Sequence, residues 1–66
     1  MNKEMKFFIY LLEKYAEYKN TTADKVLNMF DNLKITDLIY DMYEQYHTEA
    51  IENAFEDIDK MVLENS

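Results

Sequence analysis

Residues Thr48 to Leu63, TEAIENAFEDIDKMVL, decide the fold class, because their apolar and acidic side chains alternate with the period of an α-helix. At about 100° per residue, apolar residues collect on one side and carboxylates on the other. The apolar side comprises Ala50, Ile51, Ala54, Phe55, Ile58, Met61 and Val62. The opposite side carries Glu49, Glu52, Glu56 and Asp59. The segment therefore predicts a helix with one buried face and with Thr48 as its N-cap.

The same period recurs upstream and predicts three further helices. They span about Asn2 to Lys19, Thr21 or Thr22 to Leu33, and Thr36 to Tyr46. The chain contains no Gly and no Pro, the residues on which the turns of sandwiches and barrels depend. Asn and Thr must supply the breaks. For a chain of 66 residues we predict one all-α domain over residues 1–66, a compact irregular bundle of about four helices.

The first helix has an apolar arc that is too wide for a single buried face. One stripe, which we assign to the core, comprises Met5, Phe8, Ile9, Leu12, Tyr15 and Ala16. A second stripe beside it comprises Phe7, Leu11 and Tyr18. A monomer would leave the second stripe in water, which small soluble proteins usually avoid. We therefore expect Phe7, Leu11 and Tyr18 to form an interface, and the chain alone to form a homodimer.

Charge and composition exclude several function classes. Fourteen Asp and Glu against seven Lys and no Arg give a net charge of -7, which opposes direct contact with nucleic-acid phosphates. The second and third helices resemble a helix-turn-helix only in outline, because the third carries Asp37, Asp41 and Glu44. Without Cys there is no disulfide, thiolate nucleophile or thiolate metal site. The segments are too short and too charged for a signal peptide or a membrane span, so we expect a cytoplasmic protein.

His47 is the only side chain whose ordinary pKa lies near neutrality, so a general-base role has to be considered. No nucleophile accompanies it, since there is no Cys and the only Ser is Ser66. We assign His47 to a structural junction in which Thr48 caps the last helix and Asp57 accepts a hydrogen bond from His47. The functional alternative is a polar anchor that contacts a partner protein. We expect no catalytic residue and no enzyme activity.

Metal and base-stacking sites are weighed and set aside. The acidic side of the last helix offers oxygen ligands, and Glu44-x-x-His47 matches a di-iron motif once, but a di-iron bundle needs several such sets. The six tyrosines could stack on bases, yet no basic groove accompanies them. We assign them to the core or an interface, with their hydroxyls at the wet edge. No metal or cofactor is expected.

Four runs carry a resemblance across nearly the whole chain. They are IYLLEKYA from Ile9, DKVLNMF from Asp24, IYDMY from Ile39 with the following Tyr46-His47-Thr48, and EDID from Glu56. Together they resemble a family of short acidic all-helical bacterial proteins of unknown function, typified by Tyr-Ala, His-Thr and Glu-Asp-Ile segments. Where that family often has Gly, this chain has Asn32-Leu33-Lys34, which can still adopt a left-handed cap.

The resemblance implies a partner rather than an activity. Some members of the family are encoded near proteins that resemble ADP-ribosyltransferase toxins, which implies a small regulatory or antitoxin-like role. By motif match only His47, Thr48, Glu56 and Asp57 are carried over, and no role comes with them. We expect a non-catalytic module that binds another protein. The alternatives are an acidic inhibitor that mimics DNA and an accessory subunit. The identity of the adjacent gene product would distinguish the protein-binding module from the DNA mimic.

Overall fold

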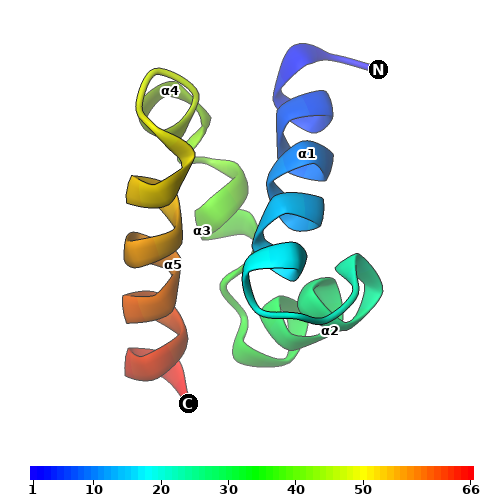
Figure 1. Ribbon diagram of the computed structural model, residues 1–66, viewed down its shortest axis with the longest axis vertical. Helices are drawn as coiled ribbons and strands as arrows, with labels where there is room; N and C mark the ends of the chain where they lie inside the picture. Colours follow the sequence, from blue (N-terminus) through cyan, green and yellow to red (C-terminus); the bar gives the residue numbers. More distant parts are fainter.

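Three long helices and two single-turn helices make up the chain, described here by a computed structural model of residues 1–66 (Figure 1). The long helices are α1 (Lys3–Tyr18), α2 (Ala23–Leu33) and α5 (Ile51–Asn65). The single turns α3 (Thr36–Tyr40) and α4 (Tyr43–Tyr46) connect α2 to α5. There is no strand, so the all-α prediction is confirmed. None of the five helices combines the length and apolarity needed to span a bilayer.

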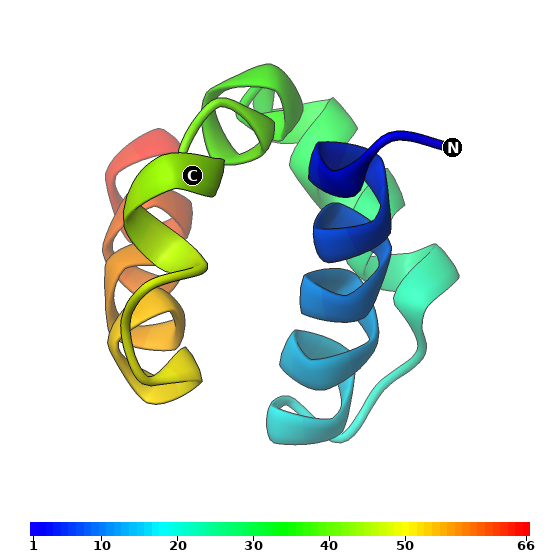
Figure 2. The same ribbon diagram turned by 90° about the horizontal axis from the view of Figure 1, so that it is seen from above.

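The helices α1 and α5 stand side by side and cross steeply. Both descend in Figure 1, but they run in opposite directions in the view from above (Figure 2). The helix α2 packs against α1, α3 and α5 and closes the lower end of the molecule. The two termini lie at opposite ends of the longest dimension, which is 28 Å. Because α1 and α5 cross, their side chains rather than their backbones bridge the space between them.

The predicted third helix is broken, which corrects the single span from Thr36 to Tyr46. α3 ends at Tyr40, and the Met42 amide donates to the Ile39 carbonyl at 3.1 Å, a tighter turn than an α-helix makes. The break changes the direction of the chain between two buried residues, Ile39 and Tyr46. As a result, Tyr43 packs edge-on against Phe7 of α1, with ring centroids 5.6 Å apart.

The buried face of α1 includes Leu11, so it is rotated about the helix axis relative to the predicted face. Leu11 is 1% exposed, whereas Met5 and Ile9, which were predicted to be buried, are 37% and 38% exposed. This rotation follows from packing, because α1 contacts α2, α3 and α4 at once. The thirteen core residues are Phe8, Leu11, Leu12, Tyr15, Ala16, Val26, Phe30, Ile35, Ile39, Tyr46, Ala54, Phe55 and Ile58.

Asn20 and Lys34 end α1 and α2 in the left-handed conformation, with φ of 58° and 60°. In each case the next amide reaches back five residues: Thr21 donates to the Ala16 carbonyl at 2.9 Å, and Ile35 donates to the Phe30 carbonyl at 3.0 Å. This is the Schellman pattern, which usually employs Gly. Two non-Gly residues therefore occupy the left-handed positions where glycine is usual. A left-handed cap was predicted for the segment that ends at Lys34.

The helix starts agree with the prediction for α2 and differ for α5. Thr22 caps α2, since its Oγ1 accepts from the Lys25 amide at 3.4 Å. The N-cap of α5 is Ala50, which has no side-chain bond to offer. Thr48 lies two residues earlier and donates its hydroxyl to the Gln45 carbonyl at 3.0 Å. Thr48 thus closes the end of α4, and its assignment as the N-cap of the last helix is wrong.

Candidate protein-interaction groove

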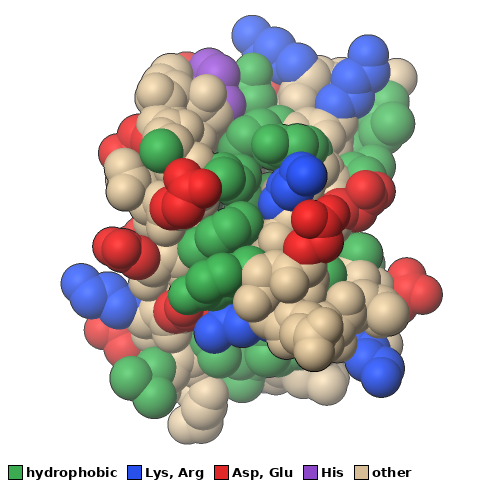
Figure 3. Space-filling view, in the orientation of Figure 1, with side chains coloured by type: hydrophobic (Ala, Val, Ile, Leu, Met, Phe, Trp, Pro, Cys, Tyr) green, Lys and Arg blue, Asp and Glu red, His purple; other side chains and the backbone are tan.

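An open groove of about 720 Å³ runs between α1 and α5. We call it the α1–α5 groove. Its lining consists of Tyr10, Lys14, Glu17 and Tyr18 from α1 and Ile51, Glu52, Phe55 and Glu56 from α5. Figure 3 shows hydrophobic side chains gathered down the middle of this face, between the two helices. The groove therefore combines an apolar floor with a charged edge.

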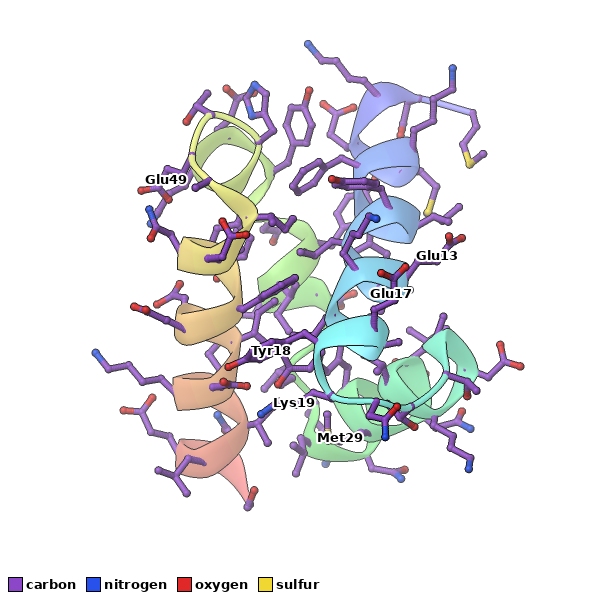
Figure 4. The ribbon with its side chains drawn as sticks, in the orientation of Figure 1. Glu13, Glu17, Tyr18, Lys19, Met29 and Glu49 are labelled. Atoms are coloured by element: carbon purple, nitrogen blue, oxygen red, sulfur yellow. The ribbon has the colours of Figure 1, made fainter.

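Tyr18 and Phe55 form the lower wall of the groove. Their rings are stacked, with centroids 4.7 Å apart and planes inclined by 16°. The Tyr18 side chain extends from α1 toward α5 (Figure 4), and its hydroxyl donates to Asp59 Oδ2 at 3.0 Å. Tyr18 is nevertheless 51% exposed. An aromatic ring that is both held in place and exposed can contact a ligand at little cost in conformational entropy.

The edge of the groove is mainly acidic. Three glutamates, Glu17, Glu52 and Glu56, face one lysine, Lys14, so the lining residues sum to a charge of -2. The Lys14 Nζ lies 3.8 Å from Glu17 Oε2 and 5.8 Å from the centroid of the Tyr10 ring. Lys14 therefore occupies the aromatic and acidic surface that a positively charged group from outside would contact.

Asp59 joins α5 to the end of α1 beneath the groove. Its Oδ1 accepts from the Tyr15 hydroxyl at 2.6 Å and lies 2.9 Å from Lys19 Nζ. Burial alone would raise the pKa of Asp59, but the hydrogen bonds from Tyr15, Lys19 and Tyr18 outweigh it and lower the pKa. Burial, followed by the bond to Asp59, raises the pKa of the Tyr15 hydroxyl. At neutral pH these hydrogen bonds and the ion pair of Asp59 link α5 to the end of α1, and we call this link a tie.

Asp57 makes a second tie on another side of α5. The Tyr46 hydroxyl donates to Asp57 Oδ2 at 2.6 Å, and the Tyr46 ring is 1% exposed. Burial, followed by the bond to Asp57, raises the pKa of Tyr46. The expected bond from His47 to Asp57 is therefore wrong. The partner of Asp57 is the tyrosine one position earlier, because Tyr46 points into the core while His47 is exposed.

His47 packs on its own helical turn. Its ring stacks on Tyr43, with centroids 4.1 Å apart and planes inclined by 3°, and Nδ1 lies 2.6 Å from the Tyr43 carbonyl oxygen. No nucleophile or carboxylate is bonded to it. His47 thus ends α4 and extends the aromatic surface of Tyr43 and Phe7, whose ring centroid is 6.5 Å from that of His47.

The three predicted interface residues do not share one surface. Leu11 is buried in the core, so its assignment to an exposed stripe is wrong. Phe7 is half-buried against Tyr43, and Tyr18 lies in the wall of the groove. Tyr10, Ile51 and Phe55 were not predicted to share a surface with Tyr18. The edge of the α5 apolar face, where Ile51 and Phe55 lie next to Glu52 and Glu56, was the available signal.

A second cleft, of about 580 Å³, lies between the end of α1, α2 and the end of α5, and its lining includes Tyr15 and Asp59. Val26, Met29, Val62 and Leu63 supply its apolar lining, with Lys19 and Lys25 at the edge; Figure 4 shows Lys19 and Met29 close together there. It has fewer aromatic residues than the α1–α5 groove. No cluster of three or more His, Cys, Asp or Glu side chains is arranged to hold a metal ion.

Comparison with known protein families gives one match. The model of a family described as a protein of unknown function, DUF3791, matches residues 6–65. The chain belongs to this family. No curated protein and no solved structure matches the chain. Membership therefore covers nearly the whole domain and brings no assigned activity.

Proposed function

We propose that this protein is a non-catalytic interaction module, a regulatory or antitoxin-like partner that binds another protein through the α1–α5 groove. The observation that carries the proposal is the exposure of Tyr10 and Tyr18, 47% and 51%, beside Phe55 and Ile51. Tyrosine is enriched where proteins contact one another, since its ring supplies apolar area and its hydroxyl tolerates water. The remaining aromatic side chains are committed to the core or to local stacking.

A DNA-mimicking inhibitor is the alternative that the net charge of -7 supports. Such a protein needs carboxylates in place of phosphates, and it gives no role to an apolar floor. The α1–α5 groove has both an apolar floor and an acidic edge, so binding to a protein surface accounts for more of its features. A DNA-mimic would lose affinity for its target when duplex DNA competes, whereas the proposed complex would not.

A second copy of the chain is a less suitable occupant than a different protein. A two-fold arrangement would place the glutamates of one groove near those of the other. The stripe on which a homodimer was predicted is also incomplete, because Leu11 lies in the core. Light scattering of the isolated chain tests this: a monomer mass fits the proposal, and a dimer that Tyr10→Ala dissociates would mean that a second copy fills the groove.

The first partner to test is the product of the adjacent gene, including the toxin-like proteins that the family resemblance implies. Isothermal titration calorimetry should give a complex that Tyr10→Ala weakens by about tenfold or more, the loss typical of a central aromatic contact. The matched control is Leu38→Ala, which truncates a side chain that is 55% exposed outside the groove. Equal affinities for wild type and Tyr10→Ala would contradict the proposal.

A further inference from the structure

We infer that the α1–α5 groove is built to receive a basic, arginine-containing segment of the partner protein. This inference rests on the proposed function and adds the chemistry of the occupant. It follows from the groove lining, which combines aromatic faces, three glutamates and one lysine. The occupant it specifies carries positive charge at its edges and an apolar side chain between them.

The aromatic faces already attract the cations of the chain itself. The Lys14 Nζ lies 5.8 Å from the Tyr10 ring centroid, and the Lys19 Nζ lies 5.0 Å from that of Tyr18. Both distances are within the range of a cation–π contact. Arginine makes this contact better than lysine, since its planar guanidinium stacks on a ring and remains free to bond a carboxylate with two parallel N–H groups.

The glutamates supply those carboxylates on both sides of the groove. Glu17 belongs to α1, and Glu52 and Glu56 follow each other by one helical turn on α5. Only Glu17 has a basic partner, Lys14, at 3.8 Å. Glu52 and Glu56 are exposed and form no ion pair within the chain. Two carboxylates thus remain available next to the apolar side chains of Ile51 and Phe55.

Ile51 and Phe55 select the apolar part of the segment. They lie one turn apart on α5, and the Phe55 ring is fixed against Tyr18. A leucine or a similar side chain placed between two arginines would cover the half-buried Ile51 and the exposed Tyr18 ring, which rests on the core residue Phe55, and would remove apolar area from water. An acidic segment would instead meet three glutamates, and like charges across a contact suppress binding.

Lys14 provides the sharpest test, because it is the only positive charge in the lining. Lys14→Gln uncovers the Tyr10 face and frees Glu17, so a basic segment should bind more tightly and an acidic segment more weakly. Removal of two negative charges, in Glu52→Gln with Glu56→Gln, should weaken binding of the basic segment. Its matched control is Glu13→Gln with Glu49→Gln, two glutamates that point away from the groove (Figure 4). Both pairs change the net charge from -7 to -5 by removing two carboxylates.

The probe is the peptide acetyl-Arg-Leu-Leu-Arg-amide, titrated into isotopically labelled protein and followed by amide chemical shifts. We expect shifts centred on Tyr10, Tyr18, Ile51 and Phe55. Exposed ion pairs contribute up to about 1 kcal/mol, or about fivefold in affinity. We therefore expect Kd to fall by about two- to fivefold in Lys14→Gln and to rise by about two- to tenfold in the Glu52 and Glu56 double variant.

Three outcomes would overturn the inference: an unchanged or higher Kd in Lys14→Gln, equal losses in the groove pair and its control, or tighter binding of acetyl-Glu-Leu-Leu-Glu-amide. Failure of the inference is distinguishable from failure of the proposed function. If Tyr10→Ala weakens binding of the partner protein while Lys14→Gln leaves the Kd of the peptide unchanged, the groove is an interface for a segment of other chemistry. If the affinity of the partner protein is also unchanged in Tyr10→Ala, the proposed function fails.

Discussion

The Tyr46 hydroxyl donates to Asp57 Oδ2 at 2.6 Å, and this bond holds the single turn α4 to the long helix α5. The residues are eleven positions apart, and the connection between them contains His47 and Thr48. Both of those side chains bond only to the backbone of their own turn. The His-Thr pair therefore closes α4, while the adjacent tyrosine anchors it.

Tyr46→Phe should lower the free energy of unfolding by about 1–3 kcal/mol, because Asp57 loses the donor that compensates its partial burial. His47→Ala is the matched comparison from the next position. It should change stability by less than about 0.5 kcal/mol, since the imidazole is exposed. Urea unfolding of both variants checks this. A larger loss in His47→Ala than in Tyr46→Phe would restore His47 as the anchor of the junction.

Alkaline pH should destabilise the protein through Tyr15 and Tyr46. Folding raises the pKa of both hydroxyls, so the folded chain holds these protons more tightly than the unfolded chain does. Their contribution is fully present below about pH 10 and is lost as the pH rises toward the folded pKa values. The Tyr15→Phe, Tyr46→Phe double variant should be less stable at neutral pH but lose less stability above about pH 10. Parallel losses in wild type and variant would contradict this.

Acidic pH should also destabilise the protein, through Asp59, whose pKa is shifted in the opposite direction to those of the two tyrosines. The folded chain lowers the pKa of this carboxyl, so its contribution is present above the ordinary value of about 3.9 and is lost as the pH falls through the folded pKa. Asp59→Asn should therefore be less stable than wild type at neutral pH, with a difference that shrinks below about pH 4. Glu64→Gln, at an exposed position on the same helix, serves as the control. A difference that is constant with pH would argue against the tie.

Lys34→Gly should stabilise the protein by about 1 kcal/mol, because a lysine at φ of 60° carries a steric cost that Gly does not. Asn20→Gly should gain less, since Asn tolerates this conformation. Lys60→Gly within α5 should cost about 1 kcal/mol by the usual helix penalty. Thermal unfolding of the three variants gives the order. A destabilised Lys34→Gly would mean that the lysine side chain stabilises the turn by contacts of its own.

The sequence predicts the elements better than it predicts their arrangement. Helical period and a capping hydroxyl locate α2 and limit its cap to Thr21 or Thr22, since both signals are local; the structure selects Thr22. The break after Tyr40 has no local signal, because it follows from the packing of Ile39 and Tyr46 into one core. The core face of α1 depends on which neighbours surround it, so Leu11 and Met5 exchange their predicted environments.

The α1–α5 groove could not be predicted from the sequence for the same reason. Tyr15 bonds Asp59 across 44 positions, and Tyr18 stacks on Phe55 from the same two helices. No spacing in the sequence specifies that α1 and α5 cross where these residues meet. The assignment of tyrosines to the core is confirmed for Tyr15 and Tyr46, each 1% exposed, but their hydroxyls donate to Asp59 and Asp57 instead of lying at a wet edge, and these partners required the tertiary structure.

Chemical-shift mapping can decide whether the α1–α5 groove binds another protein. Isotopically labelled protein is titrated with the product of the adjacent gene, and the amide signals are followed residue by residue. We expect saturable changes centred on Tyr10, Tyr18, Ile51 and Phe55, and none centred on the cleft at Met29 and Val62. Saturable changes confined to that cleft, or no change at all, would contradict it.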